Sequence, residues 1–450
     1  MAKQTYLDYI QTLLPQSEWN DFADFYKQRL PKTIKIVTSK IAPAVFKNVV
    51  TQLWRITKDI EIPDAPESQD GSDRLVVETW AGSKTLGQSF LHQWGYIYIQ
   101  ELSASLSAPL LGAKPGDLIL DLCAAPGGKT VQLADTGAFV AANEPNNPRR
   151  KALIYNLNRT GMFNTAVLNL EWTRVGGMYP QFFDKVLVDA PCSGEWMSYK
   201  TGGPLSRNPG MIESLARTQV KLLASAIDAC KPGWTVVYST CTLNTIENED
   251  VIEAIQQQYA DRIQLIFSKK YRPHRDHTGW FFVAKFKVSP EAGSKCVQTL
   301  HCNVSTNNFD ISPRLQAQIR EQLSLDFGIS KLPDHYFFLA TPQSIYLTSA
   351  DYTKIHGTIS LDKIWIPIYD IARDGRFLPT HHLGNILWQY ASHHVISLNT
   401  EQAQAYAEYK DLKLTEEYQA LENGFYLLNF QNTGYSLTKK TAEMIKNKML

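Results

Sequence analysis

Short runs of β-branched and aliphatic residues alternate with longer stretches of helical periodicity through the middle of the chain. The clearest of these stretches, residues 211–231, repeats apolar residues at helical spacing and gives way to Pro232 and Gly233, which predicts a helix. Such alternation is typical of parallel strands joined by helical crossovers, with helices on both faces of the sheet. The sequence therefore predicts an α/β fold with a doubly wound sheet, whose expected strands are 118–122, 138–143, 165–170, 184–188 and 234–239.

The pattern changes on both sides of this central region. Before it, helical spacing over residues 5–30 predicts a small helical leader, and a loop rich in Pro, Ser and Gly over 64–74 ends the first unit. After it, a polar linker and several short strand-like runs indicate small mixed α/β or β-barrel modules. The expected domains are 1–75 (α/β), 76–288 (the doubly wound sheet), 309–390 (mixed α/β) and 391–450 (β-rich), with a linker over 289–308.

Composition limits the partners and the compartment. The 450 residues carry 45 Lys+Arg against 44 Asp+Glu, a net charge of +1, so any contact with nucleic acid must come from local basic patches. The first residues lack the apolar core of a signal peptide, and no run is long enough to span a bilayer. Six cysteines without a C-x-x-C pair suit reduced thiols. We expect a cytoplasmic protein without disulfides or structural zinc.

A glycine-rich turn follows the first strand of the predicted sheet. Ligands of doubly wound sheets bind at the carboxyl ends of the strands. There, Gly127 and Gly128 permit close backbone approach, and the helix that follows offers free N–H groups. We therefore expect the loop over 123–129 to hold an adenosine-bearing cofactor. The next strand ends at Glu144, where a carboxylate accepts both hydroxyls of a ribose; a solvated strand-end glutamate is the alternative.

The same loop departs from the phosphate-binding motif G-x-x-x-x-G-K-[ST] only at its first position, where Cys123 replaces glycine. Pro126 removes one backbone N–H from the loop, and Ala124 and Ala125 restrict its dihedral angles. These features disfavour a phosphate cradle. A P-loop nucleotide hydrolase remains a competing hypothesis, which predicts phosphate release and dependence on magnesium.

Two cysteines follow buried strands, Cys192 in Asp-Ala-Pro-Cys-Ser and Cys241 in Ser-Thr-Cys-Thr. Parallel strands end at the same edge of a sheet, so we expect both thiols beside the cofactor loop. Asn244 and Glu247 form a capping-box pattern, which predicts a helix start close to Cys241 that stabilises its thiolate. Cys230 is expected to be a core residue, and a core role is the alternative for the other two thiols.

A thiolate beside a methyl donor suits one chemistry in particular. Carbon 5 of a pyrimidine becomes nucleophilic once a thiolate adds to carbon 6, and the ring can then attack an electrophilic methyl group. Removal of the carbon 5 proton and expulsion of the thiolate undo the adduct, which gives a second ionisable group a role. Asp189 is placed to hydrogen-bond ring nitrogen 3 and the exocyclic amine of cytosine.

These motifs, in this order, resemble those of the Nop2/Sun family of RNA cytosine-5 methyltransferases. The resemblance spans roughly residues 95–287 and implies a class I, Rossmann-like methyltransferase sheet. The segments that carry it are 100–104, 121–130, Glu144, 158–161, 189–194, 239–242 and 279–285.

The resemblance also implies roles for individual residues. Cys241 would be the attacking nucleophile, Cys192 would assist release of the methylated product, and Asp189 would complete the catalytic set. The cofactor would be S-adenosylmethionine, and no metal is expected. The family usually has Asp at a further acidic position where this chain has Glu171. The implied cofactor-binding residues are Cys123, Ala124, Ala125, Pro126, Gly127, Gly128, Lys129, Glu144, Glu171 and Asp189.

The tail resembles the C-terminal region of the bacterial RsmF (YebU) branch of this family, whose end is similar to a PUA RNA-binding domain. The matching segments are 381–384, 398–411, 424–430 and 445–448. This resemblance implies small-subunit (16S) ribosomal RNA as the substrate and a role in rRNA processing. Transfer RNA is the alternative substrate, and a non-catalytic RNA-binding ribosome-assembly factor is the alternative function. A monomer is expected.

Charge alone suggests where RNA would lie. The expected RNA-facing groups are 149–151, 269–275, Lys439, Lys440, Lys446 and Lys448, each with an ordinary solvated face as the alternative. The target base must leave its stack to reach Cys241, so the expected substrate is single-stranded or loosened RNA.

Overall fold

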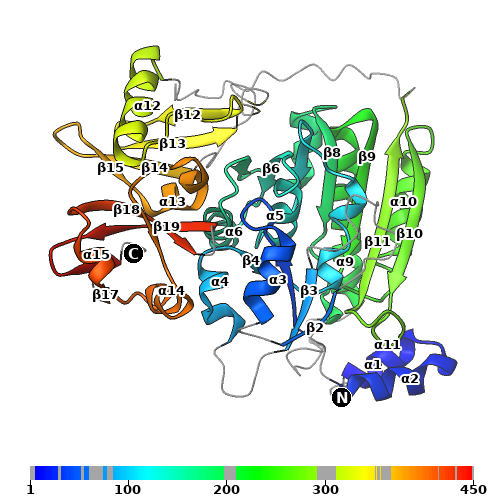
Figure 1. Ribbon diagram of the computed structural model, residues 1–450. Helices are drawn as coiled ribbons and strands as arrows, with labels where there is room; N and C mark the ends of the chain where they lie inside the picture. The colour runs from blue at the N-terminus through cyan, green and yellow to red at the C-terminus, as the bar shows by residue number, and fades with distance from the viewer. Residues whose placement is uncertain are drawn as a thin grey trace.

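The computed structural model describes residues 6–28, 32–51, 55–59, 74–78, 85–196, 209–290, 311–349, 351, 355, 366–413, 415–430 and 433–447. Within them the chain forms a seven-stranded sheet, two four-stranded sheets and a five-stranded sheet. The seven-stranded sheet occupies the centre, with the N-terminal helix pair below its β10–β11 edge and the two C-terminal sheets on its other side (Figure 1).

The central sheet confirms the predicted doubly wound α/β fold. Its order is β10-β11-β9-β8-β5-β6-β7; strands β5 to β9 pair in parallel, whereas β11 is antiparallel to both β9 and β10. The chain starts at β5 in the middle, moves outward through β6 and β7, and returns to β8 on the other side. The strands are β5 (Leu118–Asp121), β6 (Phe139–Asn143), β7 (Thr165–Leu168), β8 (Phe183–Asp189), β9 (Cys230–Thr240), β10 (Ile263–Tyr271) and β11 (Phe281–Val288).

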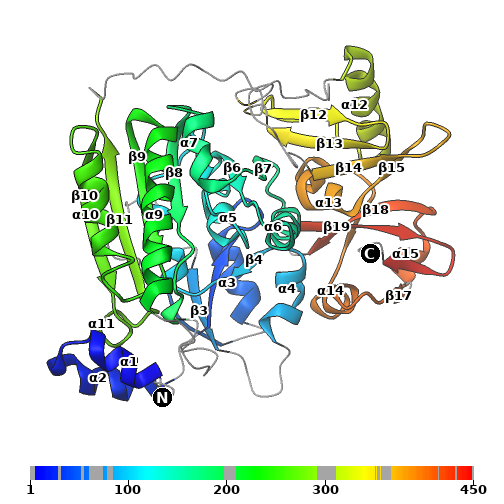
Figure 2. The same cartoon turned by 180° about the vertical axis from the view of Figure 1, so that it is seen from behind.

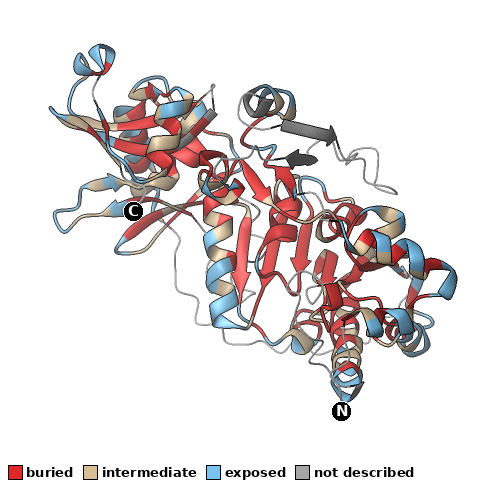
Figure 3. Cartoon of the chain, turned by 90° about the horizontal axis from the view of Figure 1, so that it is seen from below, coloured by how far each residue is buried: buried red, intermediate tan, exposed pale blue. Residues whose placement is uncertain are grey.

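Alternating side chains of these strands build two core layers. On β5, Leu118 and Leu120 pack with α7, α9 and α10, whereas Ile119 packs on the opposite face with α5 and α6. The sheet is consequently buried on both faces. Figure 2 shows helix α9 across the sheet from behind, and Figure 3 shows the strands coloured as buried. No helix in the described part of the chain is long and apolar enough to cross a membrane. The helices are α4 (Phe90–Gln93), α5 (Gly128–Ala134), α6 (Asn147–Thr160), α7 (Val175–Met178), α9 (Pro209–Ala229), α10 (Glu249–Gln258) and α11 (Pro273–Asp276), with 3-10 turns η2 (Leu86–Gln88), η3 (Ser103–Ser105), η4 (Pro109–Leu111) and η5 (Trp172–Arg174).

The five strands predicted for the sheet are all present, with ends that differ by a few residues. The long predicted helix ends at Ala229, and Cys230 opens β9 instead of closing the helix. Cys230 is fully buried, as expected of a core residue. Strands β10 and β11 form an antiparallel hairpin, and β10 extends to Tyr271, so Lys269 and Lys270 of the expected RNA-facing group 269–275 lie in a strand.

A second sheet crosses the boundary that was placed near residue 75. Its order is β2-β3-β1-β4, all antiparallel, so β3 and β4 complete a sheet that begins in the predicted N-terminal unit. The domain limits themselves stay a prediction. The elements are α1 (Tyr6–Leu13), α2 (Gln16–Tyr26), β1 (Lys32–Ile36), α3 (Pro43–Thr51), β2 (Arg55–Asp59), β3 (Arg74–Glu78) and β4 (Ile97–Ile99).

The C-terminal region is β-rich, as predicted, and contains two further sheets. One is an antiparallel meander, β12-β13-β14-β15, and the other has the order β16-β18-β19-β20-β17, in which β16 and β18 are parallel. Helix α13 packs against strands of both sheets, β14 and β19. The elements are α12 (Pro313–Phe327), β12 (Tyr336–Ala340), β13 (Ser344–Ser349), β14 (Ile366–Ile371), β15 (Phe377–Pro379), α13 (His381–Leu387), η7 (Trp388–Tyr390), β16 (Val395–Ser397), α14 (Thr400–Ala407), β17 (Leu412–Lys413), α15 (Glu416–Gln419), β18 (Gly424–Phe430), β19 (Thr433–Lys440) and β20 (Met444–Asn447).

One buried lysine joins the N-terminal unit to the C-terminal region. The ammonium of Lys40 donates to the carbonyl oxygen of Trp94 and, at 3.2 Å, to Oδ1 of Asn385 in α13. Burial, and then the nearby charge of Arg159, lower the pKa of Lys40 to about 7. At mildly alkaline pH, Lys40 has therefore lost its proton in the folded chain but keeps it in the unfolded chain.

We expect Lys40→Met to change how stability depends on pH. Because the pKa is lowered from 10.5 to about 7 on folding, the unfolded state binds more protons between these values, and this group makes the free energy of unfolding rise with pH there. Urea denaturation at several pH values should show that Lys40→Met reduces this slope, by up to about 1.4 kcal/mol per pH unit. Lys287→Met, on an exposed lysine of β11, is the control; equal slopes in the two variants would contradict the assignment.

Candidate active site

The loop that follows β5 lies at the carboxyl edge of the sheet, where the strand order reverses. The backbone N–H of Leu122 donates to Leu187 O at 2.9 Å, and that of Ala124 donates to Asn143 O at 3.0 Å, which ties the loop to both neighbouring strands. Gly127 adopts φ +111°, a conformation open to glycine, and starts α5. The loop is thus fixed at the place where doubly wound sheets bind their ligands.

Asp121, the last residue of β5, carries a carboxylate without exposure to solvent. Its Oδ2 accepts a hydrogen bond from Thr130 Oγ1 at 2.7 Å, whereas Oδ1 has no hydrogen-bond partner in the described part of the chain. Burial raises the pKa of Asp121 to about 7, and the charges of Asp189 and Glu144 act in the same direction. Burial also raises the pKa of the Cys123 thiol, so this cysteine stays neutral.

Glu144 follows β6 directly and is fully buried. Its Oε1 accepts from the backbone N–H of Asn146 at 2.9 Å, and its Oε2 lies 3.0 Å from Nη1 of Arg149. Arg149 also donates from Nη2 to Ala125 O at 2.9 Å, so its guanidinium bridges the cofactor loop and Glu144. Sequence reasoning placed Arg149 among RNA-facing cations and missed this role, although its position in the first turn of the helix after Glu144 was a signal.

Glu171 lies three residues beyond β7 and is exposed. Its Oε1 is 3.5 Å from the Thr173 hydroxyl, a weak contact within the same turn. The structure brings Glu171 to the correct edge of the sheet but gives it no contact with the loop over 123–129. Its role in cofactor binding stays a prediction.

Asp189 ends β8 and is held from two sides. Its Oδ2 lies 2.6 Å from Lys129 Nζ, at the start of α5, and its Oδ1 accepts from the Ser239 hydroxyl at 2.8 Å. About a third of the Asp189 side chain is exposed, so the carboxylate is fixed in orientation and accessible from the cofactor edge.

The two predicted thiols meet. Sγ of Cys192 lies 3.3 Å from Sγ of Cys241, and both residues are partly exposed. The hydrogen bond with Cys241 is the largest cause that raises the pKa of Cys192, followed by burial. Cys192 is therefore held as a protonated thiol within hydrogen-bond distance of Cys241.

The predicted helix start beside Cys241 is wrong. Helix α10 begins at Glu249, with Asn248 as the residue before it. Asn244 does accept from the Glu247 backbone N–H, at 2.9 Å, but its amide is turned toward buried carboxylates and the chain runs on as a loop. A helix dipole at Cys241 is consequently not part of this site.

The N-terminal helices pack against the thiol edge. Tyr6, Ile10 and Phe22 share a hydrophobic cluster with Trp280, and Cys241 packs against that cluster. Figure 1 shows α1 and α2 beside α11, below β10 and β11. Sequence reasoning did not predict that this leader contributes to the wall of the site.

Part of the expected RNA-facing group 269–275 holds these helices in place. The carboxylate of Glu18 in α2 binds Arg272, lies 2.9 Å from His274 Nε2, and lies 2.9 Å from Arg275 Nη2. Lys270 of β10 pairs with Glu249 at 2.8 Å. Contact of this segment with RNA stays a prediction, and its cations already have partners within the chain.

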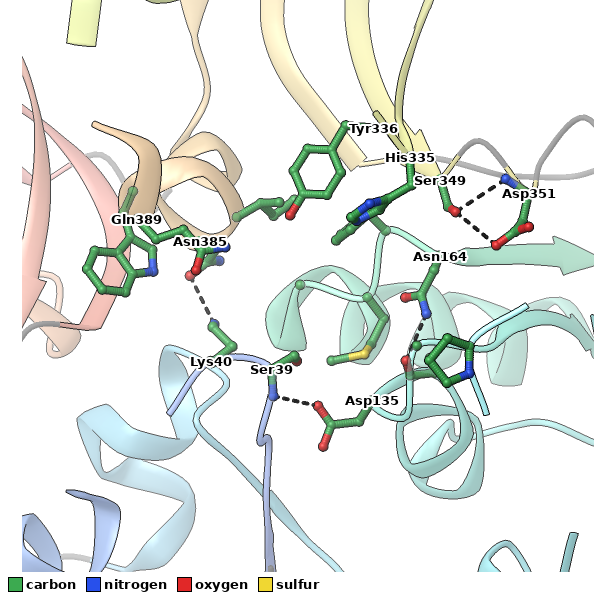
Figure 4. A pocket seen from close by; sticks show the side chains of 18 of the residues that line it. Ser39, Lys40, Asp135, Asn164, His335, Tyr336, Ser349, Asp351, Asn385 and Gln389 are labelled. Atoms are coloured by element: carbon green, nitrogen blue, oxygen red, sulfur yellow. Dashed lines mark hydrogen bonds between the residues drawn. The ribbon is translucent and has the colours of Figure 1, made fainter. Parts of the chain in front are cut away.

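A separate cavity of about 500 Å³ lies at the opposite, amino edge of the parallel strands. Figure 4 shows Lys40, Asn385 and Tyr336 around it, together with Asn164 and Asp135 from the loops before β7 and β6. None of the predicted site residues lines it. Among the described residues, no group of three or more His, Cys, Asp or Glu is arranged to hold a metal ion.

Comparison with known proteins decides the family. A family model described as 16S rRNA methyltransferase RsmB/F matches residues 108–287. A Vibrio cholerae protein named Ribosomal RNA small subunit methyltransferase F is 30% identical over 458 residues, which cover 95% of this chain and 92% of the relative. A protein of the same name from Erwinia tasmaniensis is 29% identical and covers 98% and 94%. The chain belongs to the RsmB/F methyltransferase family.

This membership confirms the resemblance drawn from the motifs and makes the chain a methyltransferase. Solved structures agree on the fold. A methyltransferase homologue from Pyrococcus horikoshii has a TM-score of 0.52 at 24% identity and covers 63% of this chain and 98% of its own. NSun6 from the same organism has a TM-score of 0.52 at 20% identity, with 64% and 98% covered.

The cofactor of this RsmB/F methyltransferase is S-adenosylmethionine. It carries a sulfonium and an ammonium, and the edge where it would bind is rich in carboxylates: Glu144 and Asp189 lie close enough to Asp121 for their charges to raise its pKa. The unpartnered Oδ1 of Asp121 adds a buried acceptor. The residues present therefore fit a cationic cofactor held by the loop over 123–129.

We expect Glu144→Gln to weaken cofactor binding. A carboxylate that accepts ribose hydroxyls makes charged hydrogen bonds, and its loss should raise the Kd for S-adenosylmethionine about tenfold or more in equilibrium dialysis. Glu171→Gln tests whether the Glu171 carboxylate also binds the cofactor. Glu213→Gln, on the exposed face of α9, is the matched control. If Glu171→Gln changes the Kd no more than Glu213→Gln, Glu171 does not contact the cofactor.

Proposed function

We propose that this RsmB/F methyltransferase transfers a methyl group to carbon 5 of a cytosine in small-subunit ribosomal RNA. The single observation that carries the proposal is the pair of thiols, 3.3 Å apart, at the cofactor edge of the sheet. Relatives that match almost the whole chain are named for small-subunit ribosomal RNA, which supports the substrate. The alternative of a non-catalytic assembly factor gives no reason for two adjacent, accessible thiols.

Cys241 is the proposed nucleophile. Its partner Cys192 keeps its proton, because the pKa of Cys192 is raised by the hydrogen bond with Cys241 and by burial. Cys192 therefore lies beside the proposed nucleophile as a protonated thiol, 3.3 Å from its sulfur. Addition of the Cys241 thiolate to carbon 6 makes carbon 5 of the ring nucleophilic, and S-adenosylmethionine supplies the electrophilic methyl group.

Cys192 acts in the release of the product. Once Cys241 has become a thioether, it no longer bonds to Cys192 as a thiolate, and the largest cause of the raised pKa of Cys192 is gone. Cys192 therefore becomes easier to deprotonate at the stage when a base must take the carbon 5 proton. The electrons of that C–H bond re-form the double bond between carbons 5 and 6 and expel Cys241 as a thiolate.

Asp189 orients the base. Ser239 and Lys129 fix its two oxygens, so the carboxylate presents a defined set of lone pairs beside the thiols. We assign it two hydrogen bonds from cytosine: one from the exocyclic amine, and one from the N–H that forms when ring nitrogen 3 takes up a proton as the thiolate adds, which neutralises the charge of the activated ring. This contact favours cytosine over uracil, which lacks the amine.

The RNA must present its base outside a stack. A cytosine in a duplex cannot bring carbon 6 to a thiol between two strand ends, so a looped-out or single-stranded target is required. The β-rich C-terminal sheets are proposed to bind the surrounding RNA as PUA-like modules. Transfer RNA as substrate, a monomeric state and localisation in the cytoplasm stay predictions.

Methyl transfer from radiolabelled S-adenosylmethionine tests this function. Small-subunit particles, free 16S rRNA and transfer RNA are offered separately, and nucleosides are analysed for 5-methylcytidine. We expect label in the small-subunit RNA, loss of all activity in Cys241→Ala, and a trapped protein–RNA adduct in Cys192→Ala, because the adduct forms but is not resolved.

Cys230→Ala is the matched control for both variants. Its thiol is fully buried in the core and should leave methyl transfer within about twofold of wild type. Label in a base other than cytosine, or equal activity in Cys241→Ala and wild type, would overturn the proposal. Label only in transfer RNA would show that transfer RNA is the substrate, and the proposed mechanism would still hold.

A further inference from the structure

The two loops that carry the thiols are joined by a buried polar cluster. It contains no apolar side chain, and its members come from both loops and from the neighbouring helix α9. All of them are almost without exposure to solvent. The cluster consists of Ser193 and Glu195 after Cys192, of Thr242, Asn244 and Glu247 after Cys241, and of Gln219 in α9.

Glu247 reaches from the Cys241 loop to the Cys192 loop. Its Oε1 accepts from the backbone N–H of Ser193, the residue next to Cys192, at 2.7 Å. The same oxygen accepts from the Gln219 amide at 2.9 Å, and Oε2 accepts from the Asn244 amide at 2.7 Å. Among the described residues, each of these three hydrogen bonds to the carboxylate thus comes from an N–H donor.

Glu195 makes the reverse connection. Its Oε2 accepts from the backbone N–H of Leu243, two residues after Cys241, at 2.6 Å. Its Oε1 accepts from the Asn244 amide at 2.8 Å and from the hydroxyl of Tyr9 in α1 at 2.6 Å. Each thiol loop therefore sends a carboxylate across to a backbone N–H of the other loop.

The hydroxyl of Ser193 adds a cross-link, since it lies 3.0 Å from that of Thr242. Burying two carboxylates is costly unless donors surround them, and apolar side chains would fill the same volume without that cost. The carboxylates instead fix geometry, because a charge-assisted hydrogen bond sets both the distance and the angle between the two backbone segments that it joins. The backbones so fixed are those that place the two sulfur atoms.

We propose that Glu195 and Glu247 form a reciprocal clamp that sets the separation of the Cys192 and Cys241 thiols, with Tyr9 bracing it from the N-terminal helices. Both glutamates are positioning residues, since neither touches the reacting base. The clamp rests on the proposed function in one respect: the separation matters because one thiol adds to the ring and the other must then reach the adjacent carbon.

Glu247→Gln is the sharpest test. The new amide would turn an N–H toward groups that are themselves donors, so one buried contact is lost whichever way it points. Glu195→Gln makes the same change at the other carboxylate. The matched control is Asp117→Asn, another buried carboxylate, which binds Lys185 at 2.6 Å at the amino end of β5.

Proximity of the thiols is measured without any methyl transfer. Phenylarsine oxide condenses with two neighbouring thiols, forming two As–S bonds and releasing one water, with no change in oxidation state. We expect its affinity for the Cys192–Cys241 pair to fall about tenfold or more in Glu247→Gln and Glu195→Gln, and to stay unchanged in Asp117→Asn. Cys192→Ala gives the baseline for a single thiol.

Kinetics supply the second readout. In both glutamine variants, kcat for methyl transfer should fall about tenfold or more, whereas the Kd for S-adenosylmethionine and the KM for RNA stay within about twofold. Far-UV circular dichroism and a melting curve verify that each variant is folded. If the glutamine variants do not fold, Tyr9→Phe, which removes a single donor at the rim of the clamp, should show the same two effects in reduced size.

Wild-type arsenical affinity in a folded glutamine variant, or in Tyr9→Phe where the glutamine variants do not fold, would overturn the clamp. The clamp would also be overturned if kcat falls in Asp117→Asn as far as in Glu247→Gln. The loss of activity would then follow from changing any buried carboxylate. If wild type methylates no cytosine while its thiol pair still depends on both glutamates for arsenical binding, the proposed function fails and the clamp stands.

Discussion

Parallel pairing of β8 with both β5 and β9 is the constraint on which the rest of the site depends. Asp189 lies opposite Ser239 in this register, and Leu187 lies opposite Asp121. Cys192 follows Asp189 by three residues and Cys241 follows Ser239 by two, so the register brings both thiols to one point of the edge. A slip of one residue would turn the side chains of β8 to the other face and separate these groups.

Charge at this edge is unevenly neutralised. Asp189 has Lys129 at 2.6 Å and Glu144 has Arg149 at 3.0 Å, whereas buried Asp121 makes no ion pair with a described residue, and its pKa rises, mainly through burial. A bound cationic cofactor would supply the positive charge that Asp121 lacks and would be attracted to its ionised form. Loss of the cofactor's positive sulfonium on methyl transfer removes part of that attraction, which helps the enzyme to exchange its spent cofactor.

Sequence patterns could predict the structural features that are determined by residues close together in the chain. Strand ends, the glycine turn and both cysteines follow from local motifs, so the edge of the sheet and the thiol pair were predicted. The capping box at Asn244 and Glu247 was misread because both side chains bind Glu195 or Ser193, about 50 positions away, which a local pattern does not contain. The pairing of Glu18 with Arg272 spans 254 positions and left no signal for the same reason.

The N-terminal helices therefore belong to the active site, although they lie outside the sheet. Glu18 anchors α2 to the turn between β10 and β11, and this anchor places α1 so that the Tyr9 hydroxyl meets Glu195. Burial and the charge of Glu195 raise the pKa of Tyr9, so the phenol stays protonated and donates to the carboxylate. A partly buried hydrogen bond thus links a segment near the start of the chain to the loops that carry the thiols, and the proposed catalytic edge is complete only when leader and sheet are packed together.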